Sequence, residues 1–60
     1  MRFFFDLNMD NAAFDPDYSV ELVKQLRKTA ARIEADPVNE RWGHLVDSNG
    51  NRVGKFEIGD

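Results

Sequence analysis

Three consecutive phenylalanines, Phe3, Phe4 and Phe5, stand near the start of a chain of 60 residues. Side chains alternate between the two faces of a β-strand, so Phe3 and Phe5 share one face and Phe4 lies on the other. A domain of this size usually covers only one face of its sheet. We therefore expect Phe4 to need a second cover, and another protein chain is the simplest one.

The size and composition of the chain limit how it can be stabilised. We expect one domain, residues 1–60, and a domain this small buries only about 60% of the surface that its unfolded chain exposes. Small folds often compensate with disulfides, a metal or oligomerisation. The sequence has no cysteine and a single histidine, His44, which excludes disulfides and thiolate or histidine-rich metal sites. Oligomerisation remains, or else an unusually well packed single layer. We expect a homo-oligomer without a metal or another cofactor.

The charge of the chain is too mild for a protein that binds duplex DNA. Eleven acidic and eight basic residues give a net charge of −3, whereas such proteins usually have a strongly basic face. No apolar run approaches the roughly 18 residues that span a bilayer, and Asp6 interrupts the apolar start that a signal peptide would need. We expect a soluble protein of the cytoplasm with no membrane partner.

Hydrophobic periodicity predicts the order strand, helix, strand, strand. Residues 2–9 alternate as a half-buried strand does. We expect the helix to begin with Asp15 as the capping carboxylate and Pro16 in the first helical position. It must end by Asp36, because Pro37 disfavours a helical residue before it. The predicted fold is α+β with βαββ order, in which one helix packs on a three-stranded sheet that ends in a β-hairpin.

The hairpin is the clearest local signal of the sequence. Strand-like residues 42–46 and 52–58 flank an Asn-Gly pair at 49–50, and both residues of that pair tolerate a positive φ. A two-residue turn and a bulged three-residue loop differ by one residue in register, and both remain open. Val53 and Phe56 differ in parity, so a bulge near Gly54 would let Val53, Phe56 and Ile58 face one core.

The expected core lies between the helix and one face of the sheet. Phe14, in the turn-rich loop before the helix, should fold back onto it. The opposite sheet face carries Phe4 together with Trp42 or Val46, and it is open unless a second subunit covers it. Phe4 and Trp42 are therefore the predicted interface residues. The predicted core residues are Phe3, Phe5, Leu7, Leu22, Leu26, Ile33, Val53 and Phe56.

Basic and aromatic residues suggest one candidate ligand site near a subunit interface. An arginine can grip a phosphate and a tryptophan can stack on a base, so such a site would suit a nucleotide. The simpler interpretation is a solvated helix face and a tryptophan in the core or in an interface. A protein target would instead meet the acidic segment from Asp10 to Asp17. The candidate ligand-binding residues are Arg27, Arg32, Arg41, Trp42 and His44.

Catalysis and metal binding are less favoured by the sequence. His44 could act as a general base. The candidate serine nucleophiles are Ser19 and Ser48, and their spacing from His44 does not indicate a catalytic triad. Residues 47–51 match the first positions of a calcium loop, whose later glycine and glutamate are missing, so a plain hairpin turn is expected. We predict no enzyme, no catalytic residue and no metal site. Four acids could hold a divalent metal at the top of the sheet, but two of them are better explained as helix-start residues: Asp6, Asp10, Asp15 and Asp17.

Four segments together carry a family resemblance: 10–15 (DNAAFD), 26–28, 31–34 and 47–56 (DSNGNRVGKF). With them the chain resembles a family of very short proteins encoded by bacteriophages and prophages. The resemblance implies a non-enzymatic phage protein that counters bacterial immunity in the host cell, by binding an immune effector or by sequestering a nucleotide signal. The alternative is an accessory regulatory or structural phage protein that binds nucleic acid or a replication or transcription factor.

Overall fold

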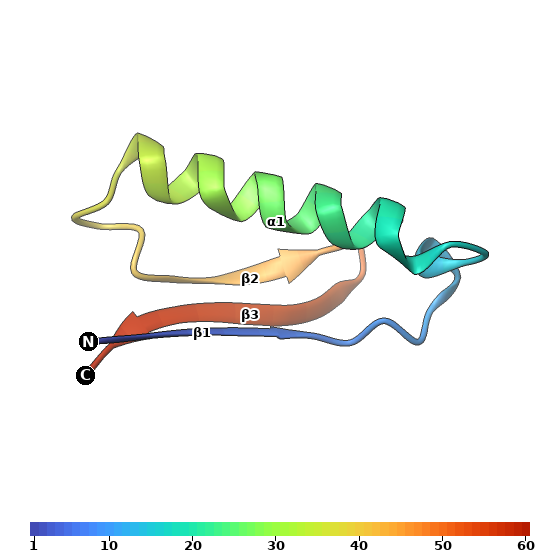
Figure 1. The fold of residues 1–60 in the computed structure, drawn as a ribbon, viewed down its shortest axis with the longest axis horizontal. Coiled ribbons are helices and arrows are strands. Elements are labelled where there is room, and N and C mark those ends of the chain that lie inside the picture. Colours follow the sequence, from blue (N-terminus) through green and yellow to red (C-terminus); the bar gives the residue numbers. More distant parts are fainter.

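The computed structural model describes all residues from 1 to 60. One helix packs against a three-stranded antiparallel sheet with the strand order β1-β3-β2 (Figure 1). The predicted α+β class, the βαββ order and the C-terminal hairpin are confirmed. The elements are β1 (Arg2–Leu7), a short 3-10 helix η1 (Ala12–Phe14), α1 (Tyr18–Ala35), β2 (Trp42–Val46) and β3 (Arg52–Gly59).

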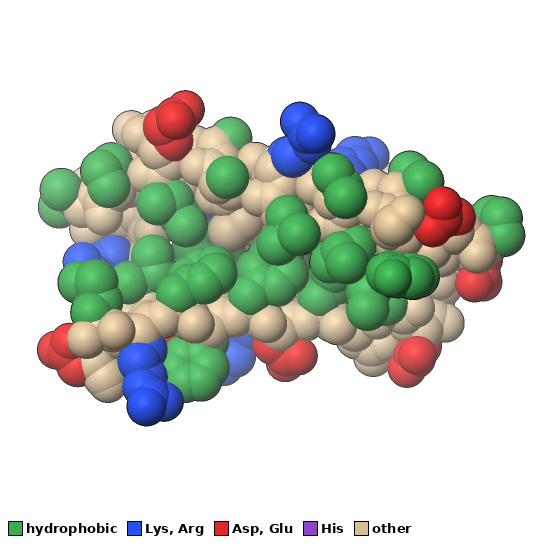
Figure 2. Space-filling model, in the orientation of Figure 1, with side chains coloured by type: hydrophobic (Ala, Val, Ile, Leu, Met, Phe, Trp, Pro, Cys, Tyr) green, Lys and Arg blue, Asp and Glu red, His purple; other side chains and the backbone are tan.

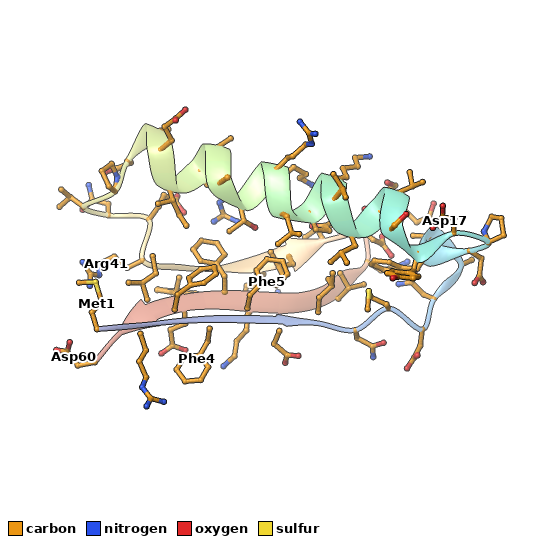
Figure 3. All side chains as sticks on the ribbon, in the orientation of Figure 1. Met1, Phe4, Phe5, Asp17, Arg41 and Asp60 are labelled. Carbon is orange, nitrogen blue, oxygen red and sulfur yellow. The ribbon has the colours of Figure 1, made fainter.

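The central strand β3 pairs with both edge strands, and the pairing fixes which side chains share a face. Phe5 lies opposite Phe56 on the face that α1 covers, which we call the inner face. Phe4 and Trp42 both lie opposite Glu57 on the other face, which we call the outer face. Figure 3 shows Phe5 pointing toward the helix and Phe4 pointing away from it. The alternation predicted for the phenylalanine run is confirmed.

The loop between β2 and β3 is a three-residue loop with a glycine bulge. The Asp47 N–H donates to the Asn51 carbonyl at 2.9 Å, and the Gly50 N–H donates to the Asp47 carbonyl at 3.1 Å. Gly50 has a φ of 85°, a conformation that glycine adopts without a steric penalty. Of the two loops compatible with the sequence, the longer one is therefore present.

A β-bulge in β3 removes the parity conflict of this strand. The pairing of β2 with β3 shifts between Leu45 and Val46, which leaves Val53 as the extra residue of β3. As a result Val53 and Phe56 are both buried on the inner face. The predicted bulge is confirmed.

The helix begins later than the sequence indicates. Asp15 and Pro16 lie before it, so the prediction of Asp15 as the cap is wrong, and Asp17 is the N-cap residue. The Asp17 carboxylate accepts hydrogen bonds from the Ser19 hydroxyl at 2.7 Å and the Ser19 N–H at 3.0 Å. These bonds, the hydroxyl first, lower the pKa of Asp17. The end of the helix before Pro37 agrees with the prediction, and α1 lacks the length and apolar character needed to cross a membrane.

The buried core is small. The fold of Phe14 onto the core is confirmed, whereas Leu45 was not among the predicted core residues. The prediction is wrong for Phe3 and Leu26, whose side chains are 53% and 45% exposed. Phe5, Leu7 and Ile33 are partly buried, and they pack against four fully buried hydrophobic residues: Phe14, Leu45, Val53 and Phe56.

The most buried residues of α1 are polar, which explains why Leu26 is exposed. Glu21, Gln25 and Thr29 repeat every four residues along one face of the helix and are only 4%, 1% and 3% exposed. The Gln25 Nε2 atom donates to the Val46 carbonyl and to the Glu21 carboxylate, at 2.8 Å each. The polar stripe thus holds α1 over the edge strand β2, and the apolar stripe of the helix is turned to one side.

This rotation leaves the core open along one side of the molecule. Leu22 and Leu26 each follow the polar stripe by one residue, about 100° around the helix. Lys28 lies on the other side of that stripe and reaches the Val46 carbonyl of β2, so the leucines lie on the side of β1. Figure 2 shows a continuous band of hydrophobic side chains between the helix and the sheet. We call this band the open flank and define it by Phe3, Phe5, Leu22 and Leu26.

Candidate functional site

The outer face of the sheet is the candidate binding surface, because no element of the chain covers it (Figure 1). It carries alternate side chains from all three strands. Antiparallel pairing aligns these side chains in rows that run across the strands. Two of the rows are Phe4–Glu57–Trp42 and Asp6–Lys55–His44.

Both predicted interface residues belong to this face. Phe4 and Trp42 lie on the two sides of Glu57, and their side chains are 59% and 62% exposed. Large aromatic side chains contribute most of the apolar area of an interface when a partner covers them. The structure therefore agrees with the expectation that Phe4 has no cover within its own chain.

Arg41, Trp42 and His44 lie together at one end of the sheet, with Trp42 and His44 on the outer face and Arg41 just before β2. The Trp42 and His44 rings meet edge to face, with their centroids 5.4 Å apart. The Ile58 N–H donates to the Arg41 carbonyl at 2.6 Å, which holds Arg41 against the end of β3. These residues and Lys55 help to line a groove of about 390 Å³, which is within the size range of small-molecule sites. Arg41 makes no ion pair, so its guanidinium can receive an anion.

The other two candidate ligand residues do not join this group, because α1 lies on the inner face. Arg27 is exposed on the helix. Arg32 is already engaged: its guanidinium lies 3.0 Å from the Glu40 carboxylate and 5.0 Å over the Phe56 ring, and it donates to a backbone carbonyl of β2. Gly43 leaves the room for this guanidinium, since a Cβ there would collide with it. Of the predicted five residues, the structure brings three together.

A polar cluster at the other end of the molecule ties the hairpin loop to the segment before α1. Asp47 is only 5% exposed. Its carboxylate accepts hydrogen bonds from the N–H groups of Asn49 and Asn51, at 2.9 Å each, and from the Asn11 side chain at 2.7 Å. These bonds, the one from the Asn51 N–H first, lower the pKa of Asp47, although burial opposes the shift. Asp47 therefore acts as the organising residue of a hairpin turn, as the sequence predicts.

Glu21 extends this cluster onto the helix. Its carboxylate accepts hydrogen bonds from the Ser48 hydroxyl at 2.6 Å and from Gln25 at 2.8 Å. The bond from Ser48 is the main cause of a lowered pKa of Glu21, and burial opposes it. A glutamate on a helix is expected to face solvent, but the Glu21 side chain is buried. The signal that was missed is the spacing of Glu21, Gln25 and Thr29, which places three uncharged or acidic polar side chains on one line.

The hydroxyl of Ser48 is occupied by this cluster. It donates to Glu21 and accepts from the Lys24 Nζ atom at 2.8 Å. His44 belongs to the outer face, where its ring contacts Trp42. No group of three or more histidine, aspartate or glutamate side chains lies close enough together to hold a metal ion.

Comparisons with protein families, with characterised proteins and with solved structures find no match for this chain. The surfaces described above therefore carry the functional argument.

Proposed function

We propose that this protein is a non-enzymatic phage protein that acts as a homo-oligomer in the cytoplasm of the host bacterial cell. It counters bacterial immunity by binding an immune effector or by sequestering a nucleotide signal. The observation that carries the binding role is the excess of exposed over buried apolar side chains: four hydrophobic residues are buried, whereas eleven large hydrophobic side chains are exposed. The phage context comes from the resemblance of the sequence.

The exposed apolar area favours association with another chain over a monomer in solution. Burying apolar surface contributes roughly 25 cal/mol per Å². Contiguous exposed apolar patches on soluble proteins commonly mark interaction sites. Here the open flank on the inner face and the Phe4 and Trp42 side chains on the outer face supply two such surfaces. A homo-oligomer that covers part of them leaves the remainder for a target.

The group formed by Arg41, Trp42 and His44 supports the nucleotide mode. A base would stack on Trp42, and the phosphate would accept hydrogen bonds from the guanidinium of Arg41. Lys55 lies 3.9 Å from Glu57 and is partly neutralised by it, so Arg41 is the better anion ligand. Stacking of a base on an aromatic side chain contributes about 1–3 kcal/mol.

Trp42 also provides the test, because it is the only tryptophan of the chain. We expect a cyclic nucleotide or an ADP-ribose derivative to quench its fluorescence and to raise the melting temperature. A ligand at 100 times its Kd adds about 2.7 kcal/mol of stability. Arg41→Ala should weaken the titration, whereas the control Arg27→Ala, on the helix, should leave it unchanged.

The effector mode gives a different result. If no nucleotide changes either signal, sequestration is rejected. The tagged protein should then retain an immune effector from infected cells, through a surface that includes the exposed acidic residues between Asp10 and Asp17. Retention of neither a nucleotide nor an effector would reject the proposed role in immunity.

A further inference from the structure

The two edges of the sheet differ in whether side chains of the same chain form hydrogen bonds with their outward backbone groups. At the β2 edge, the Val46 carbonyl accepts hydrogen bonds from Gln25 at 2.8 Å and Lys28 at 3.4 Å. The neighbouring outward carbonyl, that of His44, accepts a hydrogen bond from Arg32 at 3.2 Å. Side chains of α1 therefore occupy two of the outward carbonyls that another strand would need, and they hinder strand addition at β2.

The β1 edge has no such protection. The Asn8 N–H donates to the Val53 carbonyl of β3 at 2.7 Å, and backbone groups alternate in direction along a strand. The N–H and C=O groups of Phe3, Phe5 and Leu7 therefore point away from β3. No hydrogen bond from a side chain reaches them. An unpaired edge with bulky apolar side chains is a template for another strand.

We propose that β1 pairs antiparallel with β1 of a second copy of this chain, across a two-fold axis at Phe4. The two sheets then join into one continuous sheet. This inference rests on the homo-oligomer of the proposed function, and it specifies the interface of that oligomer. A two-fold axis perpendicular to the sheet makes identical edge strands antiparallel, so the contact closes on itself and does not propagate.

The sequence of β1 is complementary to itself in this register. Arg2 lies opposite Asp6 of the second copy, Phe3 lies opposite Phe5, and Phe4 meets its own symmetry mate. Arg2 and Asp6 are both exposed, and neither makes an ion pair within its own chain. A shift of one residue would place Phe4 opposite Phe5, although the two side chains lie on different faces. An axis at Phe3 or Phe5 keeps the faces aligned but loses both charge pairs.

The same contact covers three exposed features. It satisfies the free edge, it stacks the two Phe4 rings on the outer face, and it sets the open flank of one copy opposite that of the other. The second copy also contributes to the outer face. The groove there is lined by Phe4, Asp6, Lys55 and Glu57, and Arg2 of the second copy completes it. The binding surface is therefore shared between two chains.

Charge reversal tests this register. We expect sedimentation equilibrium to show a wild-type homodimer. Arg2→Asp and Asp6→Arg should each raise its dissociation constant about tenfold or more, because both symmetry-related pairs become repulsive. The double variant restores opposite charges and should return to within about threefold of the wild type. Arg27→Asp, a reversal of an exposed charge on the helix, should leave the dissociation constant unchanged.

The outcomes separate this interface from the proposed function. A wild-type protein that is monomeric at millimolar concentration would overturn the homo-oligomer and this interface together. An oligomer that responds equally to all four variants, or to none, would overturn the β1 interface and leave the homo-oligomer standing. Circular dichroism of each variant checks that the monomer fold is intact, so a loss of dimer cannot be confused with unfolding.

Discussion

Replacing Gln25 by methionine tests how the helix is held on the sheet. Gln25 is the most buried polar residue, at 1% exposure, and its amide bridges the Val46 carbonyl and the Glu21 carboxylate. Methionine has a similar length and helix propensity, so the change leaves the helix itself intact. The substitution removes both hydrogen bonds, so the Val46 carbonyl and the Glu21 carboxylate each lose one donor.

The size of the effect follows from these two bonds. A hydrogen bond between neutral groups contributes about 0.5–1.5 kcal/mol net, and one to a charged group contributes about 1.5–3 kcal/mol. The apolar contacts of methionine return part of this loss, so we expect Gln25→Met to lower the free energy of unfolding by about 2–3 kcal/mol. A domain of this length is stable by only about 3–9 kcal/mol, so the variant loses a large fraction of its stability.

Urea unfolding followed by circular dichroism measures this difference, with the protein concentration held constant because an oligomer's stability depends on it. Arg27→Met is the matched control, since it places the same side chain on the exposed face of the same helix, and it should change the stability by less than about 0.5 kcal/mol. If Gln25→Met is as stable as this control, the polar stripe does not hold α1 on β2 and the account of the helix is wrong.

Three further predictions concern the sheet, the loop and the polar cluster. Gly54→Ala should destabilise the fold by about 1–3 kcal/mol or more, because its Cβ would collide with the backbone of β1, whereas Gly59→Ala meets nothing and should be neutral in thermal unfolding. Gly50→Ala should cost about 1–2 kcal/mol, because an L-residue is strained at φ 85°, and Gly50→Asn should cost less in the same assay. The pKa of Glu21 is lower in the folded chain, so its contribution to stability is complete above the ordinary glutamate value of 4.5 and is lost as the pH falls through the lower, folded value. Melting temperatures measured from about pH 7 to pH 3 should therefore fall in acid, and Glu21→Gln should flatten part of that fall; an unchanged profile would contradict the role of this carboxylate.

The helix and strands of this fold can be predicted from the sequence, because each depends mainly on residues that are near one another in the chain. The alternation of Phe3, Phe4 and Phe5 predicts the two faces of β1, and the parity conflict between Val53 and Phe56 predicts the bulge in β3. Both features follow from the two-residue period of a strand. They are present in the structure.

The rotation of the helix could not be predicted in this way. Periodicity indicates that the apolar stripe around Leu22 and Leu26 faces the sheet. The structure instead places Gln25 inward, because the edge of β2 needs hydrogen-bond donors and the helix supplies them. That demand comes from a strand that is distant in the sequence, so no pattern within the helix reveals it.

The candidate ligand site also combines residues that the sequence could group correctly with residues that it could not. Arg41, Trp42 and His44 are near neighbours in the sequence, and in the structure they line one groove at the end of the sheet. Arg32 is grouped with them in the prediction only because its side chain is basic. The partners that engage it, Glu40 and the Phe56 ring, are set by how the helix lies on the sheet, and this cannot be inferred from its position in the chain.

A single cysteine at position 4 tests the β1 interface most directly, because the chain has no cysteine of its own. In the proposed register, Phe4 meets its symmetry mate as a non-hydrogen-bonded pair, with Cα atoms about 4.5 Å apart, which is within the range that a disulfide spans. Phe4→Cys should therefore form a covalent dimer under mild oxidation, as seen by mass spectrometry under non-reducing conditions. Asn8→Cys, whose two copies would lie about eight residues apart along the paired strands, or roughly 26 Å, leaves both charge pairs in place and should form no covalent dimer. Equal cross-linking of both variants, or none of Phe4→Cys, would contradict the two-fold pairing of β1.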